Sequence, residues 1–420
     1  MQDIRNCNQN MSIMSSSQHA NITLDLGRKG APQYFAEQIE RGIEKGILRF
    51  KLRVPDGSSR AFPNTCAPIA GLVDHYREKH NCTFFWSRKA KHNSHATKTG
   101  ILHPYRFPLE TRGVNCLDKV WAFDSESHYE TVRGIVDSIR ASAPIGQDLI
   151  NCLELCLNEI TDNVLNHSAN DEESATGFVM AQVHREKQRI AVAVFDRGIG
   201  ILESLRRSGR AVSSSSDAIS LAVKKGISDG KGAGKGLWIL EQIIIDNEGS
   251  FEITSDGSRY SLRHLEKKRE PKLAQTKIAT RIPGTTLIDF QLNTANPTSI
   301  SRAISGYKHV DLWAEAHEEN DDGSILRFKV NEDSPGLGSR IDARRFANII
   351  SNAPKMAESI VLDFSGISIV SSSYADELIM SLSKQLGFSS LMSKIRFRHL
   401  GEDCARMFDD AMESRLGNRD

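Results

Sequence analysis

The stretch LNEITDNVLNHS, residues 157–168, places three polar side chains at intervals of four within a helical pattern of apolar residues. Glu159, Asn163 and His167 are each slightly more than one helical turn apart, so they project from nearly the same face. Singly, such residues are usual on a solvated helix face. Together they predict a helix that contributes a carboxylate, an amide and an imidazole to one site.

A second segment, AVFDRGIGI at residues 193–201, predicts a strand that ends in a polar turn. Its apolar run ends at Asp196, and Gly198 and Gly200 follow within the next four residues. An aspartate before glycine is usually a turn residue. At the end of a strand its carboxylate can also accept hydrogen bonds from an exocyclic amine such as that of adenine.

A third segment, GISDGKGAGKGLWIL at residues 226–240, has a glycine cluster that opens a helix. Glycine lets backbone amides approach an anion closely, and the helix dipole favours negative charge at that end. Lys231 and Lys235 add positive charge to the same segment. The pattern therefore predicts a phosphate-binding loop.

Two common phosphate loops are excluded by the spacing of the glycines. The P-loop pattern needs one more residue between Gly230 and Gly234, and Gly236 stands where a hydroxyl would follow Lys235. The dinucleotide fingerprint fails because Glu203 stands in place of its third glycine.

On the predicted helix, the oxygen of Asn163 suits a hard cation such as Mg²⁺.

In combination, the E-x-x-x-N helix, the D-x-G-x-G turn and the G-x-G-x-G-L loop resemble the nucleotide-binding motifs of the GHKL ATPase superfamily. Its members include gyrase and histidine kinases, and bacterial anti-sigma serine kinases are related. The resemblance covers residues 112–292. It implies a Bergerat-type α/β sandwich in which helices lie on one face of a mixed sheet, with ATP and Mg²⁺ as ligands.

The resemblance also implies a role for each matching residue. Glu159 would be the general base and Asn163 the magnesium ligand, while residues 201–229 would form a mobile lid. His167 would lie near the phosphates, although a helix-end cap or plain packing explains it equally well. The remaining expected ATP-binding residues are Asp196, Gly198 and Gly200 on the adenine side, Lys231, Gly232, Gly234, Lys235, Gly236 and Leu237 in the phosphate loop, and Thr285 beside the adenine.

The C-terminal segment SIVLDFSGISIVSSSYADELIMSLSKQLG, residues 359–387, resembles a STAS domain. In partner switching, the serine of a D-S-S-G turn in such domains is phosphorylated by a GHKL-type kinase. Here the turn contains Ser371, Ser372 and Ser373 without the acidic residue and the glycine. Ser372 and Ser373 are candidate phosphoacceptors, but a helix N-cap is the preferred interpretation of the serines.

Alternating strand and helix patterns predict a further small α/β module before the ATP-binding region. The basic segment 87–106 that follows it is interpreted as a solvated linker. The expected organisation is a flexible tail at 1–20, an α/β module of unknown role with a basic connector at 21–110, a GHKL domain at 111–292, a linker at 293–300 and a STAS-like domain at 301–420.

Composition restricts the function further. The formal net charge is +1, which gives no electrostatic argument for a nucleic-acid or membrane partner. No apolar run reaches the roughly 20 residues of a membrane span. Seven scattered cysteines without a C-x-x-C pair indicate reduced thiols and a cytoplasmic location. Nucleic-acid processing is disfavoured, because no transducer-like block follows residue 292.

Three functions remain open from the sequence. The first is ATP hydrolysis with nucleotide-dependent lid closure, used in signalling with a protein partner or through self-association. The second is a serine protein kinase of the anti-sigma or partner-switch type that acts on a STAS-like serine. The third is a non-catalytic, ATP-gated interaction switch. Because a pure binding module does not need Glu159, that residue favours hydrolysis.

Overall fold

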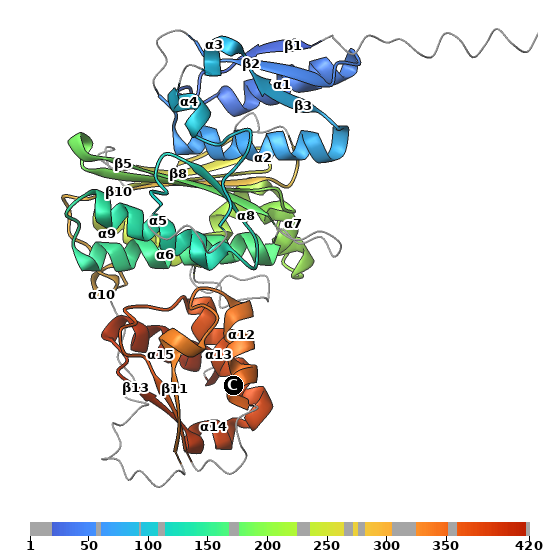
Figure 1. Ribbon diagram of the computed structural model, residues 1–420. Coiled ribbons are helices and arrows are strands. Elements are labelled where there is room, and N and C mark those ends of the chain that lie inside the picture. Colours follow the sequence, from blue (N-terminus) through green and yellow to red (C-terminus); the bar gives the residue numbers. More distant parts are fainter. Residues whose placement is uncertain are drawn as a thin grey trace, which may run out of the picture.

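The structure is a computed structural model, and it forms three tiers from the N-terminus to the C-terminus (Figure 1). Of the tail expected at residues 1–20, residues 1–18 lie outside the described residues. The structure describes residues 19–55, 60–91, 94–107, 114–167, 176–224, 236–263, 272–275, 282–304, 325–351 and 359–416.

The first tier is a parallel three-stranded sheet in the order β1-β2-β3. The predicted alternation of strands and helices is confirmed. The basic segment predicted to be a solvated linker is instead partly packed, with Ala96, Ile101 and Leu102 buried. The elements are β1 (Ala20–Thr23), α1 (Ala31–Glu44), β2 (Arg49–Arg53), α2 (Pro63–His80), β3 (Thr83–Trp86), α3 (Arg88–Lys91) and α4 (Ser94–Lys98).

The central tier is a seven-stranded sheet in the order β4-β5-β6-β10-β7-β8-β9. Its first elements are β4 (Val120–Phe123), α5 (His128–Ser142), α6 (Gln147–His167), β5 (Gly177–His184), the 3₁₀ turn η1 (Arg185–Lys187), β6 (Arg189–Asp196) and α7 (Gly200–Arg207). They are followed by α8 (Ser215–Ala222), α9 (Gly236–Asn247), β7 (Ser250–Ser255), β8 (Ser258–Arg263), β9 (Lys272–Gln275) and β10 (Thr286–Asn293). The predicted α/β sandwich is therefore confirmed.

The expectation of a mixed sheet needs a correction in detail. Within the described residues, each pair of neighbouring strands in this sheet is antiparallel. The parallel contribution is an isolated bridge between Tyr105 and Trp121 at the β4 edge. Short connections explain the arrangement, because β5–β6 and β7–β8 are joined by turns of a few residues that reverse the chain.

Both faces of the central sheet are covered, whereas the sequence predicted helices on one face only. Helices α5, α6 and α9 lie on one face, and α2 of the first tier lies across the other (Figure 1). The four residues of β4 are accordingly all buried, as expected for a strand with no solvated side. Residues 21–110 therefore include the helix that closes the sandwich.

A glycine of α2 lies close against the sheet. A Cβ at Gly71 would lie 2.3 Å from a ring atom of Phe195 in β6. Phe195 belongs to a buried apolar cluster that joins α2 with β4, β5 and β6. A side chain at position 71 would therefore separate the helix from the sheet.

The third tier is a parallel three-stranded sheet, β11-β12-β13, packed with helices. Its buried apolar residues belong to the same contiguous cluster as those of α5 and α6. Helix α15 was not predicted. The elements after β10 are α10 (Ile300–Ala303), β11 (Ile325–Lys329), α11 (Val330–Asp333), α12 (Arg340–Ser351), β12 (Ser359–Asp363), α13 (Ser372–Leu386), α14 (Phe388–Lys394), β13 (Ile395–Arg398) and α15 (Glu402–Leu416).

The linker predicted at 293–300 is held against the central tier. The Asn247 side-chain amide at the end of α9 donates hydrogen bonds to the carbonyls of Asn293, at 3.0 Å, and Asn296, at 2.8 Å. Ile300 is fully buried. Among the helices of the described residues, none is long and apolar enough to span a membrane.

Replacing Gly71 with valine should destabilise the chain. The new side chain would overlap the Phe195 ring, and overpacking of this kind costs about 1–3 kcal/mol. Urea unfolding monitored by tryptophan fluorescence measures the loss. Gly146→Ala is the control, because a Cβ there meets nothing within 4 Å. An unchanged midpoint for Gly71→Val would contradict the packing of α2 on the sheet.

Candidate active site

The polar face of α6 and the start of α9 meet closely. A Cβ at Gly236, the first residue of α9, would lie 2.6 Å from Glu159 Oε2 and 3.4 Å from Asn163 Nδ2. Only a glycine lets the chain pass so near to both side chains. The structure thus brings together Glu159, Asn163 and Gly236, which lie in two of the three segments selected from the sequence.

The turn after β6 forms a second group of predicted residues. Asp196 accepts a hydrogen bond from the Gly198 amide at 2.8 Å. Gly200 has a φ of +75°, and a Cβ there would lie 2.2 Å from Asp256 Oδ2. Asp256 also accepts a hydrogen bond from the Gly284 amide at 3.0 Å. Asp256 therefore joins the D-x-G-x-G turn to the turn before β10.

The remaining predicted residues are only partly described. Thr285 is buried, and its hydroxyl donates to the Ile282 carbonyl at 3.0 Å. Leu237 is half-buried in α9. His167 is the last residue of α6, and its side chain lies outside the description. Lys231, Gly232, Gly234 and Lys235 lie outside the described residues, so their roles stay predictions.

The segment expected to be a lid, residues 201–229, is described as far as residue 224. It contains most of α7 and all of α8. The Ser214 hydroxyl caps α8 by accepting the Asp217 amide at 3.1 Å. The described part is thus largely helical, and lid closure stays a prediction.

The serine turn of the C-terminal domain, which we define as Ser371–Ser373, reaches the polar face of α6. Ser371 is the N-cap of α13, and its hydroxyl accepts the Tyr374 amide at 3.0 Å. The N-cap interpretation is therefore confirmed for this serine. Ser372, the next residue, donates both its amide, at 2.7 Å, and its hydroxyl, at 2.5 Å, to Glu159 Oε1.

This contact places a carboxylate at the N-terminus of a 15-residue helix. The first amides of a helix have no partner within the helix, and its dipole favours an anion at that end. The Ser372 amide is one of these unpartnered amides, and Glu159 accepts its hydrogen bond. Ser372 and Glu159 are about 6% and 5% exposed, so the contact is shielded from water.

A second contact lies beside the first one. Asp162, one turn after Glu159 on α6, lies near Ser373 and the Arg340 amide, and both act to lower its pKa. The Ser373 hydroxyl is itself hydrogen-bonded to the Ser371 hydroxyl at 3.1 Å. The buried Arg340 guanidinium contacts Asp376 at 3.2 Å. It also contacts Glu377 at 3.4 Å. One buried cation therefore lies near several carboxylates at the junction of the two domains.

The loop before α12 completes the junction. The Ser371 hydroxyl donates to the Gly338 carbonyl at 2.8 Å. A Cβ at Gly338 would lie 2.5 Å from Asn158 Oδ1 on α6. The loop thus supports the serine turn on one side and approaches α6 on the other.

Burial sets the electrostatics of the two α6 carboxyls. Desolvation raises the pKa of Glu159 above its ordinary value of 4.5, and the hydrogen bond from Ser372 partly offsets this. Desolvation likewise raises the pKa of Asp162 above 3.8, opposed by Ser373 and Arg340. A raised pKa makes a carboxylate a stronger proton acceptor, which suits general-base chemistry.

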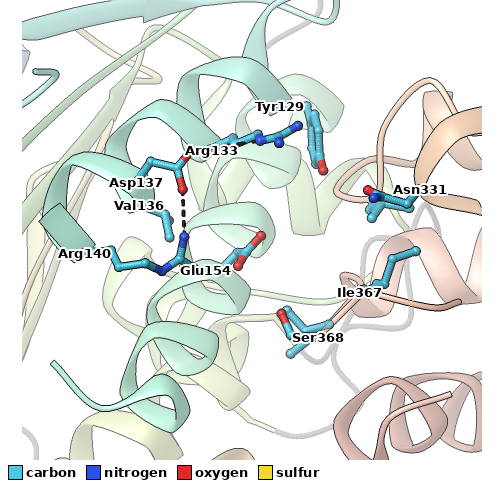
Figure 2. A pocket seen from close by; sticks show the side chains of 12 residues that line it. Tyr129, Arg133, Val136, Asp137, Arg140, Glu154, Asn331, Ile367 and Ser368 are labelled. Carbon is cyan, nitrogen blue, oxygen red and sulfur yellow. Dashed lines mark hydrogen bonds and ion pairs between the residues drawn. The ribbon is translucent and has the colours of Figure 1, made fainter. Parts of the chain in front are cut away.

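A polar crevice of about 160 Å³ lies elsewhere between the two domains. Figure 2 shows the side chains that line it. Its charged residues, Arg133, Asp137, Arg140 and Glu154, come from α5 and α6, whereas the C-terminal domain contributes uncharged residues such as Ser368. Arg140 pairs with Asp137 at 2.8 Å. The domains therefore meet partly across a charged, open boundary as well as through buried contacts.

Sequence reasoning missed Asp162, Arg340, Gly338 and Asp256. Asp162 carried a usable signal, because it lies three residues after Glu159 and so faces the same way. The other three carried none, since their roles depend on contacts between segments far apart in the chain.

Comparisons with known proteins agree with this architecture. Residues 123–257 match the family described as the histidine kinase-like ATPase domain. Residues 342–404 match a STAS-like domain of unknown function. The chain therefore carries a GHKL-type ATPase domain followed by a STAS-like domain, as the sequence motifs predicted. Among curated proteins, none matches the sequence.

One solved structure similar to the chain is the 43K ATPase domain of Thermus thermophilus gyrase B in complex with an aminocoumarin. The identity is 14% and the TM-score is 0.20. The match covers 34% of this chain and 35% of the gyrase chain. So low a TM-score carries no argument about this protein.

The stability of the chain relative to Glu159→Gln should fall as pH rises. Because the folded chain holds the Glu159 proton more tightly than the unfolded chain, ionisation opposes folding. The loss begins near pH 4.5 and is complete above the raised folded-state pKa. Urea unfolding of both chains across this range measures the difference. A relative stability that increases with pH would show that the folded-state pKa is lowered.

Proposed function

We propose that the chain is a Mg-ATP-dependent serine kinase that phosphorylates Ser372 of its own C-terminal domain. The observation that carries the proposal is the hydrogen bond from the Ser372 hydroxyl to Glu159 at 2.5 Å. Phosphoryl transfer to serine needs a hydroxyl that is hydrogen-bonded to a base and lies near a site for phosphate. Here the base is a buried carboxylate, and the phosphate site would be the N-terminus of α9, which begins at a glycine. Of the sequence-based alternatives, the structure favours the serine kinase over simple hydrolysis.

The residues present fit ATP as substrate. Asp196 lies at a strand end beside two glycines, where its carboxylate suits the adenine amine. Gly236 starts α9 against Glu159, which leaves the helix N-terminus for phosphate. Asn163 is half-buried one turn from Glu159, and its oxygen would hold Mg²⁺. When bound, Mg²⁺ would neutralise charge on the phosphates.

In the proposed reaction, the Ser372 oxygen forms a bond to the γ-phosphorus of ATP. The bond from that phosphorus to the β,γ-bridging oxygen breaks, and ADP leaves. The hydroxyl proton passes to Glu159, which already accepts it in a hydrogen bond. Burial of Glu159 both strengthens it as a base and keeps water away from the γ-phosphate.

A second candidate is ATP hydrolysis gated by the serine turn. Ser372 occupies Glu159 Oε1 with both its amide and its hydroxyl, so a water could not use that oxygen while the turn is docked. Hydrolysis would then require the C-terminal domain to leave α6. In this candidate, the turn is a regulator that a protein partner could displace.

We place this activity in protein signalling in the cytoplasm. The six described cysteines are free and buried, which supports a reducing location. A STAS-like domain whose serine turn is exchanged between α6 and another protein would serve partner switching. We expect neither nucleic acid nor membrane as a partner.

Incubation with Mg-ATP should add one phosphate to Ser372, observed by intact mass and peptide mapping. Ser372→Ala should remove the modification, and Glu159→Gln should slow it roughly 10²- to 10⁴-fold, the usual contribution of a general base. The rate should not depend on protein concentration, because donor site and acceptor lie in one chain.

Two matched variants control this experiment. Ser381→Ala removes a buried serine further along the same helix, whose hydroxyl donates to Glu377 at 2.9 Å. Glu154→Gln changes another glutamate of α6. Both should be phosphorylated at the native rate. Phosphate release without any mass gain, lost in Glu159→Gln, would establish the hydrolysis candidate instead.

Nucleotide binding itself should depend on Asp196. Asp196→Ala removes the proposed partner of the adenine amine and should weaken ATP binding by tenfold or more, on the order of the energy of a charge-assisted hydrogen bond. Isothermal titration calorimetry measures the affinity, with Asp148→Ala, an exposed change on α6, as the control. Equal affinity in both variants would contradict the proposed adenine site.

A further inference from the structure

Helix α2 of the first tier holds the residue that follows the proposed adenine-binding aspartate. Arg197, directly after Asp196, donates from Nη2 to Asp74 Oδ2 at 3.1 Å. It also donates from Nη1 to Glu78 Oε2 at 2.9 Å. Both carboxylates belong to α2. One guanidinium of the ATPase domain is therefore paired with two carboxylates of the N-terminal module.

The contact follows from the periodicities of the two elements. On the helix, Gly71, Asp74 and Glu78 are three and four residues apart, so they lie along one face of α2. On the strand side, Phe195 and Arg197 are two residues apart and lie on the same face of the sheet. The face of α2 that packs at Gly71 on Phe195 therefore also reaches Arg197.

Asp196 lies on the opposite face of the sheet. Along β6, Phe195 belongs to the apolar cluster around α2, whereas Val194 belongs to the cluster that contains the apolar residues of α6. Asp196 is two residues after Val194, so its side chain lies on the side of the sheet that α6 covers. Arg197 thus holds the end of the strand from one side of the sheet, while Asp196 faces the proposed nucleotide on the other.

We propose that the N-terminal module controls ATP affinity by holding Arg197, which fixes the Asp196 carboxylate toward the adenine amine. Arg197 and its two partners are then positioning residues, because they act on the nucleotide only through Asp196. This inference rests on the adenine site of the proposed function and is independent of where the γ-phosphate goes. It gives residues 21–110 a role in nucleotide binding in addition to closing the sandwich.

The Arg197 pairs are sufficiently shielded from water to hold the strand end. The side chains of Arg197 and Asp74 are 16% and 27% exposed, so their ion pair is less screened than one on the open surface. Burial raises the pKa of Asp74, and the Arg197 charge opposes that rise. Glu78 is about half exposed, and its pair is expected to contribute less. Asp74 is therefore the main anchor.

The far end of the turn has its own support. Gly200 lies close against Asp256, which accepts a hydrogen bond from the Gly284 amide at 3.0 Å. Loss of the Arg197 pairs would therefore loosen the Asp196 end of the turn and leave the rest in place. The expected effect is on nucleotide affinity and not on the global fold.

The test measures ATP affinity by isothermal titration calorimetry in Arg197→Ala and in the double variant Asp74→Ala/Glu78→Ala. Each should weaken binding roughly three- to tenfold, which is at most the loss expected for removing the charge-assisted hydrogen bond itself. Arg197→Lys keeps the charge and should recover part of the affinity. If Arg197→Ala folds poorly, the double variant decides, because it leaves the ATPase domain unchanged.

The variant Asp196→Ala/Arg197→Ala separates positioning from a general loss of structure. Because Arg197 acts through Asp196, this variant should bind ATP no more weakly than Asp196→Ala alone. A general loss of structure would weaken binding further. The controls are Arg185→Ala, before the opposite end of β6, and Glu44→Ala in α1, both exposed, and both should bind ATP with native affinity.

The possible results distinguish this inference from the proposed function. If Asp196→Ala weakens binding but Asp74→Ala/Glu78→Ala or a folded Arg197→Ala keeps native affinity, the inference alone is overturned. Additive losses in Asp196→Ala/Arg197→Ala would overturn it as well. Native affinity in Asp196→Ala would instead refute the proposed adenine site and the inference together. Because affinity is measured, the result holds whether or not Ser372 gains phosphate.

Discussion

A buried carboxylate that contacts the N-terminus of a helix connects the ATPase domain of this chain to its STAS-like domain. Glu159 projects from α6 of the ATPase domain and accepts both the amide and the hydroxyl of Ser372 at the N-terminus of α13. Burying an ionised group is costly unless it is hydrogen-bonded, and a helix N-terminus supplies both donors and a favourable dipole. The residue that we propose as the catalytic base therefore also holds the STAS-like domain.

The rest of the architecture keeps α6 in place for this contact. The central sheet is covered by α2 on one face and by α5, α6 and α9 on the other, so that α6 is sandwiched between the sheet and the C-terminal domain (Figure 1). The N-terminal module thus has a structural role that its sequence did not reveal. Gly236 at the start of α9 and Gly338 before α12 allow two further segments to approach α6 closely.

Patterns within one segment were predictable, and contacts between distant segments were not. Helical spacing correctly placed Glu159 and Asn163 on one face of α6. A glycine just after a helix is a usual stop signal, but the left-handed residue after α9 is Glu248, with a φ of +57°, and not Gly249. Gly249 is needed instead because a Cβ would lie 2.2 Å from the Gln291 carbonyl oxygen. In the same way, a local pattern could indicate that a serine caps α13, as Ser371 does, but it could not indicate that Ser372 donates a hydrogen bond to Glu159.

The central claim, that the serine turn lies on α6 within one chain, is tested most directly by a disulfide between Asn158→Cys and Gly338→Cys. The Gly338 Cβ would lie 3.0 Å from the Asn158 side-chain carbon Cγ, and replacing Asn158 frees that space. Mild oxidation followed by peptide mapping should show a single intrachain 158–338 disulfide that forms at any protein concentration. A reduced pair, or a disulfide found only between chains, would contradict the docked arrangement.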